Sequence, residues 1–196
     1  MQTPPTPRQR CFGNKPGQGL LAAYHDTEWG VWSDDERYLF EMLVLEGAQA
    51  GLNWETVLKK RENYRQAFYN FDVAKVAAMD DAALQRLLQN PGLIRNRLKI
   101  QSVRQNARVF LAIQQEYGTF AAYLKSFVKE APRTGRWEKL ADVPTTSSES
   151  CALSKDLKKR GMRFVGPTIV YAYMQAVGLV CDHLQSCWCV PKVGGK

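Results

Sequence analysis

The sequence contains no apolar run close to the ~20 residues that a membrane-spanning helix requires. Residues 1–10 contain three prolines and no apolar stretch of the kind found in a secretory signal peptide. The five cysteines are an odd number, and nothing else in the sequence points to secretion, so no disulfide framework is expected. We therefore expect a protein of the cytoplasm that does not associate with membranes.

Alternation of apolar and polar residues, the pattern of a half-buried β-strand, is also absent. The chain instead shows helical patterns separated by capping residues and glycines, which predicts an all-α fold. With 196 residues, of which 45% are hydrophobic, the chain is long enough to bury a core without disulfides. We expect one helical domain of two lobes over residues 11–190, with flexible tails at residues 1–10 and 191–196.

The helix boundaries are predicted from capping residues. Ser33 and Glu36 form a capping-box pattern, which predicts a helix that ends near Gly51. Asn53 is suited to cap the next helix, where apolar residues recur at helical spacing as far as Phe68. Three further helices are predicted to begin after Asp72, Asp80 and Thr119. Three more are predicted over about residues 97–116, 149–160 and 168–178. One long loop is predicted over Lys129 to Ser148.

Histidine is scarce, because the chain has only two, and each can be paired with a cysteine. Cys11 precedes His25 near the N-terminus, and His183 lies one helical turn before Cys187, so the second pair can reach a single point. The predicted ligands are Cys11, His25, His183 and Cys187. Two cysteines and two histidines form a closed tetrahedral set, which predicts one structural zinc ion per chain that links the two terminal segments.

Two alternatives to this zinc site stay open. The histidines can be core residues among scattered buried thiols, which is the commoner fate of such residues taken singly. Cys181 and Cys189 also flank the second pair, so either one could replace a ligand.

One carboxylate lies where a helical pattern expects a hydrophobic residue. The stripe before Gly51 consists of Leu39, Leu43, Glu46 and Ala50. Glu46 should therefore be buried beside a cavity, with Gln49 one turn on, Trp54 just past the helix and Tyr24 as a further wall. A carboxylate, an amide and aromatic rings around one cavity would suit a cationic, planar ligand. The alternative is a structural carboxylate that backbone donors or an arginine satisfy.

The formal net charge is +8, which favours polyanionic partners, nucleic acid first, although a merely basic surface would carry the same charge. Residues 157–168 concentrate this charge around two glycines, at the expected start of a helix. Exposed amides at such a turn bind phosphate, and basic side chains add attraction for the DNA backbone. The predicted DNA contacts are Lys158, Lys159, Arg160, Gly161, Arg163, Gly166 and Thr168. An ordinary capped turn with a solvated basic face is the alternative.

Four segments carry a resemblance to a known family: AYHDTEWG at 23–30, LFEMLVLEGAQAGL at 39–52, WETVLKKRE at 54–62 and KKRGMRFVG at 158–166. From about Cys11 to Cys189 the chain resembles the 3-methyladenine DNA glycosylase I family, within the helix-hairpin-helix glycosylase superfamily. The resemblance implies that fold, a zinc ion on the four ligands above, and a base pocket that contains Tyr24, Glu46 and Trp54.

The resemblance also implies a reaction. It predicts a monomeric enzyme that hydrolyses the N-glycosidic bond of 3-methyladenine in double-stranded alkylated DNA and releases the free base. Glu46 would bind the cationic base and assist catalysis, and Asp182 is the second candidate for a catalytic residue. The turn at 166–168 contains no lysine for a Schiff base, which favours hydrolysis without strand cleavage.

Two positions depart from the family pattern. Phe12-Gly13 follow the first predicted ligand, where the family has Gly-Trp, and Leu21 stands where a second pocket tyrosine is usual. Both changes are expected to remove aromatic or hydroxyl surface from one wall of the pocket, which affects the strictness of base selection. The alternative function is a zinc-stabilised module that recognises damaged or bent DNA without cutting it.

Overall fold

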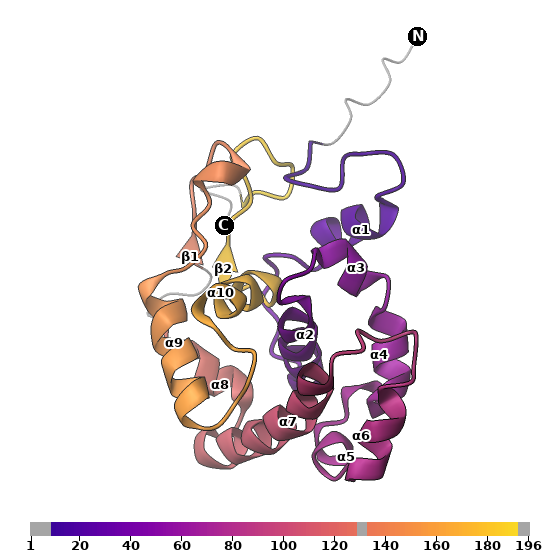
Figure 1. The fold of residues 1–196 in the computed structure, drawn as a ribbon. Helices are drawn as coiled ribbons and strands as arrows, with labels where there is room; N and C mark the ends of the chain where they lie inside the picture. The colour runs from indigo at the N-terminus through magenta and orange to yellow at the C-terminus, as the bar shows by residue number, and fades with distance from the viewer. Residues whose placement is uncertain (1–8, 129–132, 192–196) are drawn as a thin grey trace.

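The helix that carries Glu46, α2 (Glu36–Gln49), lies at the centre of the molecule (Figure 1). Every residue of α2 from Leu39 to Ala48 is buried, which explains why the segment is apolar on more than one face. Helices α3, α7, α8 and α10 all contact it. The protein is described here from a computed structural model that covers residues 9–128 and 133–191.

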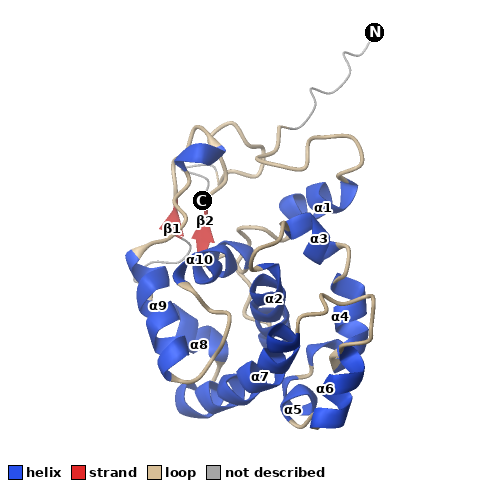
Figure 2. Cartoon of the chain, viewed as in Figure 1, coloured by secondary structure: helices blue, strands red, loops and turns tan. Residues whose placement is uncertain are grey.

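The described residues are mostly helical, with two very short strands (Figure 2). The other helices are α1 (Gly19–Thr27), α3 (Trp54–Leu58), α4 (Arg61–Ala67), α5 (Val73–Ala77), α6 (Asp81–Leu87), α7 (Arg97–Tyr117), α8 (Phe120–Lys125), α9 (Ser148–Lys159) and α10 (Pro167–Ala176). The strands β1 (Arg133–Thr134) and β2 (Val180–Cys181) pair in parallel. Each strand has two residues, which is too few for an alternation of apolar and polar residues to be visible in the sequence. The mostly helical class is as predicted, and no helix in these ranges is long and apolar enough to cross a bilayer.

Four predicted helix caps are confirmed. Asn53, Asp72, Asp80 and Thr119 each accept a hydrogen bond from the backbone N–H three residues on, at 2.6–3.1 Å. These bonds satisfy donors that a helix N-terminus leaves unpaired. The three other predicted segments correspond to α7, α9 and α10 within two residues at most ends.

Two helix predictions are wrong. Asp35, not Ser33, caps α2, and its carboxylate accepts from the N–H groups of Arg37 and Tyr38. The segment from Trp54 to Phe68 is two helices, not one, because the chain turns at residues 59–60. Helix α1 was not expected at all.

Glu36 was predicted to form a capping box with Ser33, but it binds a distant part of the chain instead. Its carboxylate accepts from the backbone N–H groups of Phe120 (2.8 Å) and Ala121 (2.9 Å) and from Gln114 Nε2 (2.7 Å). It therefore caps α8 from a distant part of the chain, where its charge also suits the positive end of the helix dipole.

Glu36→Ala should lower the free energy of unfolding by about 2–3 kcal/mol, because three donors lose a charged acceptor. Urea denaturation measures this change. Glu62→Ala is the matched control, since Glu62 is 69% exposed and makes only a surface ion pair with Arg65, so its loss should change stability by less than about 1 kcal/mol. Equal stability of the two variants would contradict the capping role.

The two ends of the described chain lie side by side at one end of the molecule (Figure 1). The Arg10 guanidinium bonds Asp26 on α1 at 2.7–2.9 Å, and Gln9 O accepts from Trp188 N at 3.0 Å. Residues 9 and 10 are thus attached to the domain, contrary to the predicted tail boundary. The rest of the predicted tails, except Pro191, lies outside the described residues. Residues 129–132 of the predicted loop also lie outside them. The described part of that loop contains β1 and the short 3-10 helix Leu140–Asp142.

Candidate functional site

A cavity of about 270 Å³ opens between α1, the C-terminal end of α2, the start of α3 and α10. Its lining residues are Phe12, Leu21, Tyr24, Trp29, Glu46, Gln49, Trp54, Ala172 and Gln175. All four residues predicted for the base pocket are among them. The volume and the mainly apolar and aromatic wall suit a flat organic ligand of purine size.

Glu46 is buried beside this cavity, as its place on the helical stripe predicted. It is 4% exposed, and its Oε2 atom has no hydrogen-bond partner. Burial raises the pKa of the Glu46 carboxyl to about 8, since no neighbouring cation stabilises the charged form. The structural alternative required backbone donors or an arginine on this carboxylate, and no such bond to Glu46 is found within residues 9–128 and 133–191. A buried, unpaired polar atom is costly, which indicates that a ligand completes it.

Trp54 faces the same cavity and has a second unpaired polar atom, its buried Nε1. The Tyr24 ring lies 5.2 Å from the Trp54 ring, centroid to centroid, at an interplanar angle of 56°. The site therefore combines two aromatic walls, one N–H donor and one carboxylate.

Three polar or aromatic residues of the cavity were not predicted as site residues, Phe12, Trp29 and Gln175. Trp29 lies within the quoted motif at 23–30, which was the only sequence signal for it. Gln175 is a polar residue in the mostly apolar helix α10, a pattern that resembles the one that marked Glu46.

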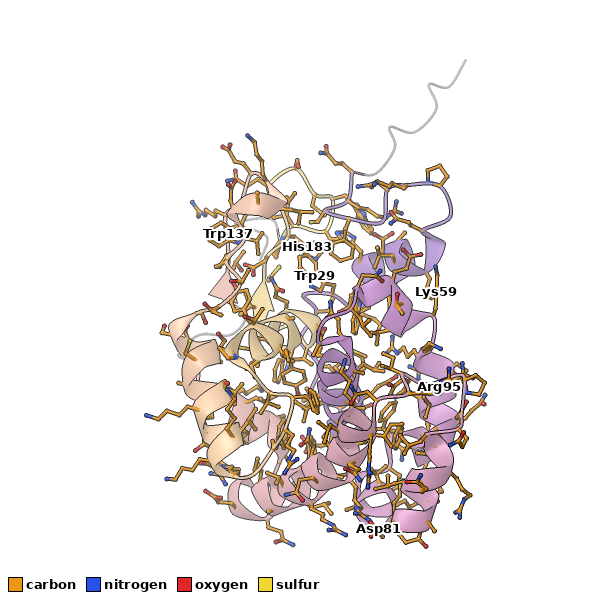
Figure 3. The ribbon with its side chains drawn as sticks, in the orientation of Figure 1. Trp29, Lys59, Asp81, Arg95, Trp137 and His183 are labelled. Atoms are coloured by element: carbon orange, nitrogen blue, oxygen red, sulfur yellow. The ribbon has the colours of Figure 1, made fainter. Side chains whose placement is uncertain are left out.

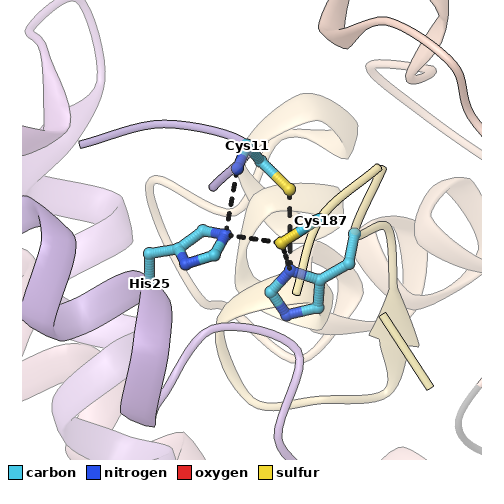
Figure 4. A group of neighbouring side chains, drawn as sticks. Cys11, His25 and Cys187 are labelled. Atoms are coloured by element: carbon cyan, nitrogen blue, oxygen red, sulfur yellow. Dashed lines mark hydrogen bonds between the residues drawn. The ribbon is translucent and has the colours of Figure 1, made fainter. Parts of the chain in front are cut away.

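The four predicted metal ligands meet in one place. Cys11, His25, His183 and Cys187 are all buried, and one ligand atom from each lies within 4.8 Å of the others. Figure 4 shows Cys11, His25 and Cys187 converging. Cys187 Sγ lies 3.4 Å from His25 Nε2 and 3.5 Å from His183 Nδ1. Cys11 Sγ lies 3.6 Å from His183 Nδ1. Such a set of donors could hold a metal ion.

Surrounding groups fix the orientation of both imidazoles. Asp26 accepts from His25 Nδ1 at 2.9 Å, and the Trp29 carbonyl accepts from His183 Nε2 at 3.0 Å, so the other ring nitrogens face the cysteines. The Arg10 guanidinium, followed by His25, lowers the pKa of Asp26 to about 2.

The cysteines proposed as substitute ligands lie further out. Cys189 Sγ is 4.0 Å from His25 Nδ1, the nitrogen that bonds Asp26. Cys189 belongs only to an alternative group with His25 and Asp26, and Cys181 belongs to neither group found among the described residues.

The metal cluster and the cavity share a wall. The Trp29 ring lies 4.8 Å from the His183 ring and 5.0 Å from the Phe12 ring, and Figure 3 shows Trp29 beside His183. Tyr24 directly precedes His25 on α1. A bound metal would therefore hold several cavity side chains in place.

The basic segment is a turn between α9 and α10, which pack against each other. Gly161 has φ = +100°, a conformation that favours glycine, and Asn106 of α7 clamps the turn through two 2.9 Å bonds to the backbone N–H and C=O of Arg163. Gly166 caps α10 without a side-chain bond, and nothing lies within 4 Å of where its Cβ would be. Small anions can therefore approach the first amides of α10.

The basic side chains of the turn differ in their partners. Lys158, Lys159 and Arg163 are exposed, as is Thr168. Arg160 instead binds Glu116 at 2.5 and 3.1 Å and Asp156 at 2.5 Å. Its guanidinium is occupied within the protein, which indicates a structural role.

Comparison with known proteins identifies the relatives of this chain. A family model described as methyladenine glycosylase matches residues 15–190. The chain belongs to the methyladenine glycosylase family. It is 53% identical over 172 residues to DNA-3-methyladenine glycosylase 1 of Escherichia coli K12, a match that covers 88% of this chain and 92% of that protein. It is 47% identical to the DNA-3-methyladenine glycosylase of Haemophilus influenzae, over 88% and 93% of the two chains.

Solved structures of methyladenine glycosylases share the fold. A crystal structure of 3-methyladenine DNA glycosylase I superposes with a TM-score of 0.88 at 52% identity, and the match covers 93% of this chain and all of that one. A Staphylococcus aureus glycosylase, whose structure describes recognition of 3-methyladenine, superposes with a TM-score of 0.86 at 38% identity over 91% and 94% of the chains.

The departures from the family pattern affect the cavity differently. The expected loss of aromatic surface at Phe12-Gly13 is wrong, because Phe12 lines the cavity and contacts Trp29 and His25 edge-on at 5.0 and 4.9 Å. Leu21 lines the cavity and offers no hydrogen bond. This methyladenine glycosylase therefore has an aromatic wall to which Leu21 adds no hydroxyl group.

Proposed function

We propose that this chain is a monofunctional DNA glycosylase that hydrolyses the N-glycosidic bond of 3-methyladenine in double-stranded alkylated DNA. The observation that carries the proposal is the buried, unpaired carboxylate of Glu46 in an aromatic cavity of purine size. Family membership and relatives named DNA-3-methyladenine glycosylase support it. We expect a monomer, because one chain supplies the cavity, the metal ligands and the basic turn.

The cavity matches the chemistry of the lesion. Alkylation at N3 makes the purine cationic, and a flipped base can then lie against Trp54 and Tyr24 while Glu46 provides the counter-charge. Pairing with a cation favours the ionised carboxylate and offsets the burial that raises its pKa to about 8. Undamaged adenine lacks this charge and would leave Glu46 without compensation.

The reaction needs little help from an acid. The bond between the sugar C1′ and the base N9 breaks with its electron pair going to the base, which is already positively charged. Water adds its oxygen to C1′ and loses a proton, and Glu46 stabilises positive charge that develops on the sugar. The described turn at 161–168 has no lysine to form a Schiff base, so the strand stays uncut.

Zinc fits the cluster of Cys11, His25, His183 and Cys187. With zinc–sulfur bonds of about 2.3 Å and zinc–nitrogen bonds of about 2.0–2.1 Å, sulfur and nitrogen at two corners of a tetrahedron are roughly 3.5–3.6 Å apart. Three of the four sulfur–nitrogen distances here are 3.4–3.6 Å. Two backbone amides, those of Leu184 and Cys189, also point at the sulfurs (3.3 and 3.4 Å). All four ligands are protein atoms, so the ion would be structural, one per chain.

Helices α9 and α10 with their turn form the helix-hairpin-helix unit of this proposal. The backbone N–H groups of Gly166 and Thr168 would bind a DNA phosphate, and Lys158, Lys159 and Arg163 would attract the backbone around it.

Release of free 3-methyladenine from methylated duplex DNA tests the proposed function. Chromatography of the soluble fraction should detect the base, and the DNA should acquire abasic sites without strand breaks. Binding to alkylated DNA without release of base would instead favour the non-catalytic DNA-binding module.

Duplex binding should depend on salt through the basic turn. Lys159→Gln combined with Arg163→Gln should weaken binding to all sequences and make the slope of log K against log salt shallower by about 1.8, since each lost phosphate contact removes about 0.9. Lys75→Gln combined with Arg86→Gln removes the same charge from α5 and α6, on another part of the surface, and is the control. Equal salt slopes for the two double variants would show that the turn is only a solvated face.

A further inference from the structure

Asp182, the second candidate for a catalytic residue, is held by three donors. It is 1% exposed and follows β2. Its Oδ1 accepts from Trp137 Nε1 at 2.7 Å, and its Oδ2 accepts from Tyr171 at 2.7 Å and from Gln175 Nε2 at 2.8 Å. Asp182 is not among the residues that line the base cavity, but Gln175 is. These contacts suit a carboxylate that orients other side chains.

The bond to Asp182 decides which way round the Gln175 amide lies. A carboxylate oxygen repels the amide oxygen and attracts the amide NH₂, so Nε2 must face Asp182. The free end of the amide is then Oε1, a hydrogen-bond acceptor. The backbone of Gln175 is also fixed, because its carbonyl accepts from Gly30 N at 2.9 Å.

We propose that Gln175 selects the base by accepting a hydrogen bond from its exocyclic amino group, and that Asp182 positions Gln175 for this contact. The inference rests on the proposed function. In 3-methyladenine attached to the sugar, the amino group at carbon 6 is the only N–H donor. A base with an oxygen at carbon 6 would place two acceptors against each other.

The rest of the cavity supplies this discrimination only in part, since the amino group has two N–H bonds and Glu46 and Gln175 can each accept one of them. Trp54 and Tyr24 contact the faces of a ring and tolerate any purine. Glu46 responds to the charge of the base, which every N3-methylated purine carries in DNA. Leu21 has no polar atom in its side chain. A fixed acceptor on the α10 side therefore adds a distinction that shape and charge do not make.

The test compares the affinities of 3-methyladenine and 3-methylhypoxanthine, which differ by the amino group and an oxygen at carbon 6. Gln175→Met keeps the length of the side chain and removes the acceptor. It should weaken binding of 3-methyladenine by about two- to tenfold, the worth of one hydrogen bond, and reduce the preference over 3-methylhypoxanthine by a similar factor.

Asp182→Asn tests the positioning role. It should weaken binding of 3-methyladenine in the wild-type background and have no further effect on it in the Gln175→Met background, because Asp182 acts on the base only through Gln175. Trp137→Phe is the control: it removes another donor to Asp182, and it should lower stability while affinity and selectivity stay unchanged.

The outcomes separate this inference from the proposed function. A wild-type chain that does not bind 3-methyladenine would overturn both. Wild-type affinity and selectivity in Gln175→Met would overturn the inference but not the proposed function. This variant tests the role of Gln175 even if Asp182→Asn does not fold. Additive effects in the double variant would show that Asp182 does not act through Gln175.

Discussion

Glu46→Gln should bind 3-methyladenine about ten- to a hundredfold more weakly than the wild-type chain, while its affinity for undamaged duplex DNA stays the same. The substitution keeps the shape of the side chain and removes its charge. A desolvated, charge-assisted hydrogen bond is worth roughly 1.5–3 kcal/mol, which gives that loss of affinity. Calorimetry with the free base measures the first quantity, and a duplex-binding titration measures the second.

The same variant should be more stable than the wild type at neutral pH. The folded-state pKa of Glu46 is about 8, above its ordinary value of 4.5, so folding opposes ionisation. Between these two values the unfolded chain has lost the proton and the folded chain still holds it, and the wild type therefore loses stability as pH rises through this interval. At pH 7 the gain from Glu46→Gln should be a few kcal/mol, measured by thermal or urea unfolding. The difference between the two proteins should vanish near pH 4.

Glu41→Gln is the matched control for Glu46→Gln. Glu41 is buried on the same helix, but it accepts from Arg61 Nε at 2.7 Å and from Arg65 Nε at 2.8 Å. Removing its charge takes the buried carboxylate away from both arginines, which keep only the less buried Glu28 and Glu62, so stability should fall and base affinity should not change specifically. Wild-type affinity for 3-methyladenine in Glu46→Gln would show that Glu46 is only a buried structural carboxylate.

The features that the sequence predicts well depend on neighbours in the chain. A helical stripe placed Glu46 toward the interior, because spacing along one helix determines which side chains share a face. Asn53 and Thr119 could be predicted as caps, since each bonds an amide three residues on. His183 and Cys187 lie one turn apart, so their convergence was also a local property.

The features that were missed depend on partners far away in the sequence. Glu36 caps a helix more than eighty residues on, and no local pattern indicates that a carboxylate prefers those amides to Ser33. Arg160 was predicted to contact DNA, and nothing in the sequence indicated that Glu116 on α7 binds its guanidinium. Gln175 and Trp29 enter the cavity only because α10 packs beside α2 and the terminal segments come together. Such contacts follow from the packing of the helices, which capping and periodicity do not specify.

Of the changes considered, removal of the proposed metal ion should lower stability most. It should disrupt the base cavity and leave the DNA-binding turn largely intact. Structural zinc contributes binding free energy of about 10–16 kcal/mol in small peptides, and here part of that energy fixes two terminal segments to one another. Cys11 and Cys187 border the hydrophobic core around α2, but most of that core is formed by other residues, so most helical structure should survive. The cavity should not, because Trp29 and Phe12 pack on the ligand His25 or His183 and also form its wall.

His183→Ala and treatment with a strong chelator should therefore give the same result: about one zinc per chain is lost, the midpoint of thermal unfolding falls, and 3-methyladenine no longer binds. Duplex binding through the α9–α10 turn should persist in the cold, since that turn is clamped by Asn106 and not by the metal. Cys151→Ser is the control, because Cys151 is exposed and outside the cluster, and it should leave zinc content and base affinity unchanged. Metal analysis, circular dichroism and both binding titrations on one preparation measure these outcomes. A metal-free chain that unfolds at the wild-type temperature and still binds 3-methyladenine would contradict the structural role, because the cavity wall would then stand without the ion that is proposed to hold it.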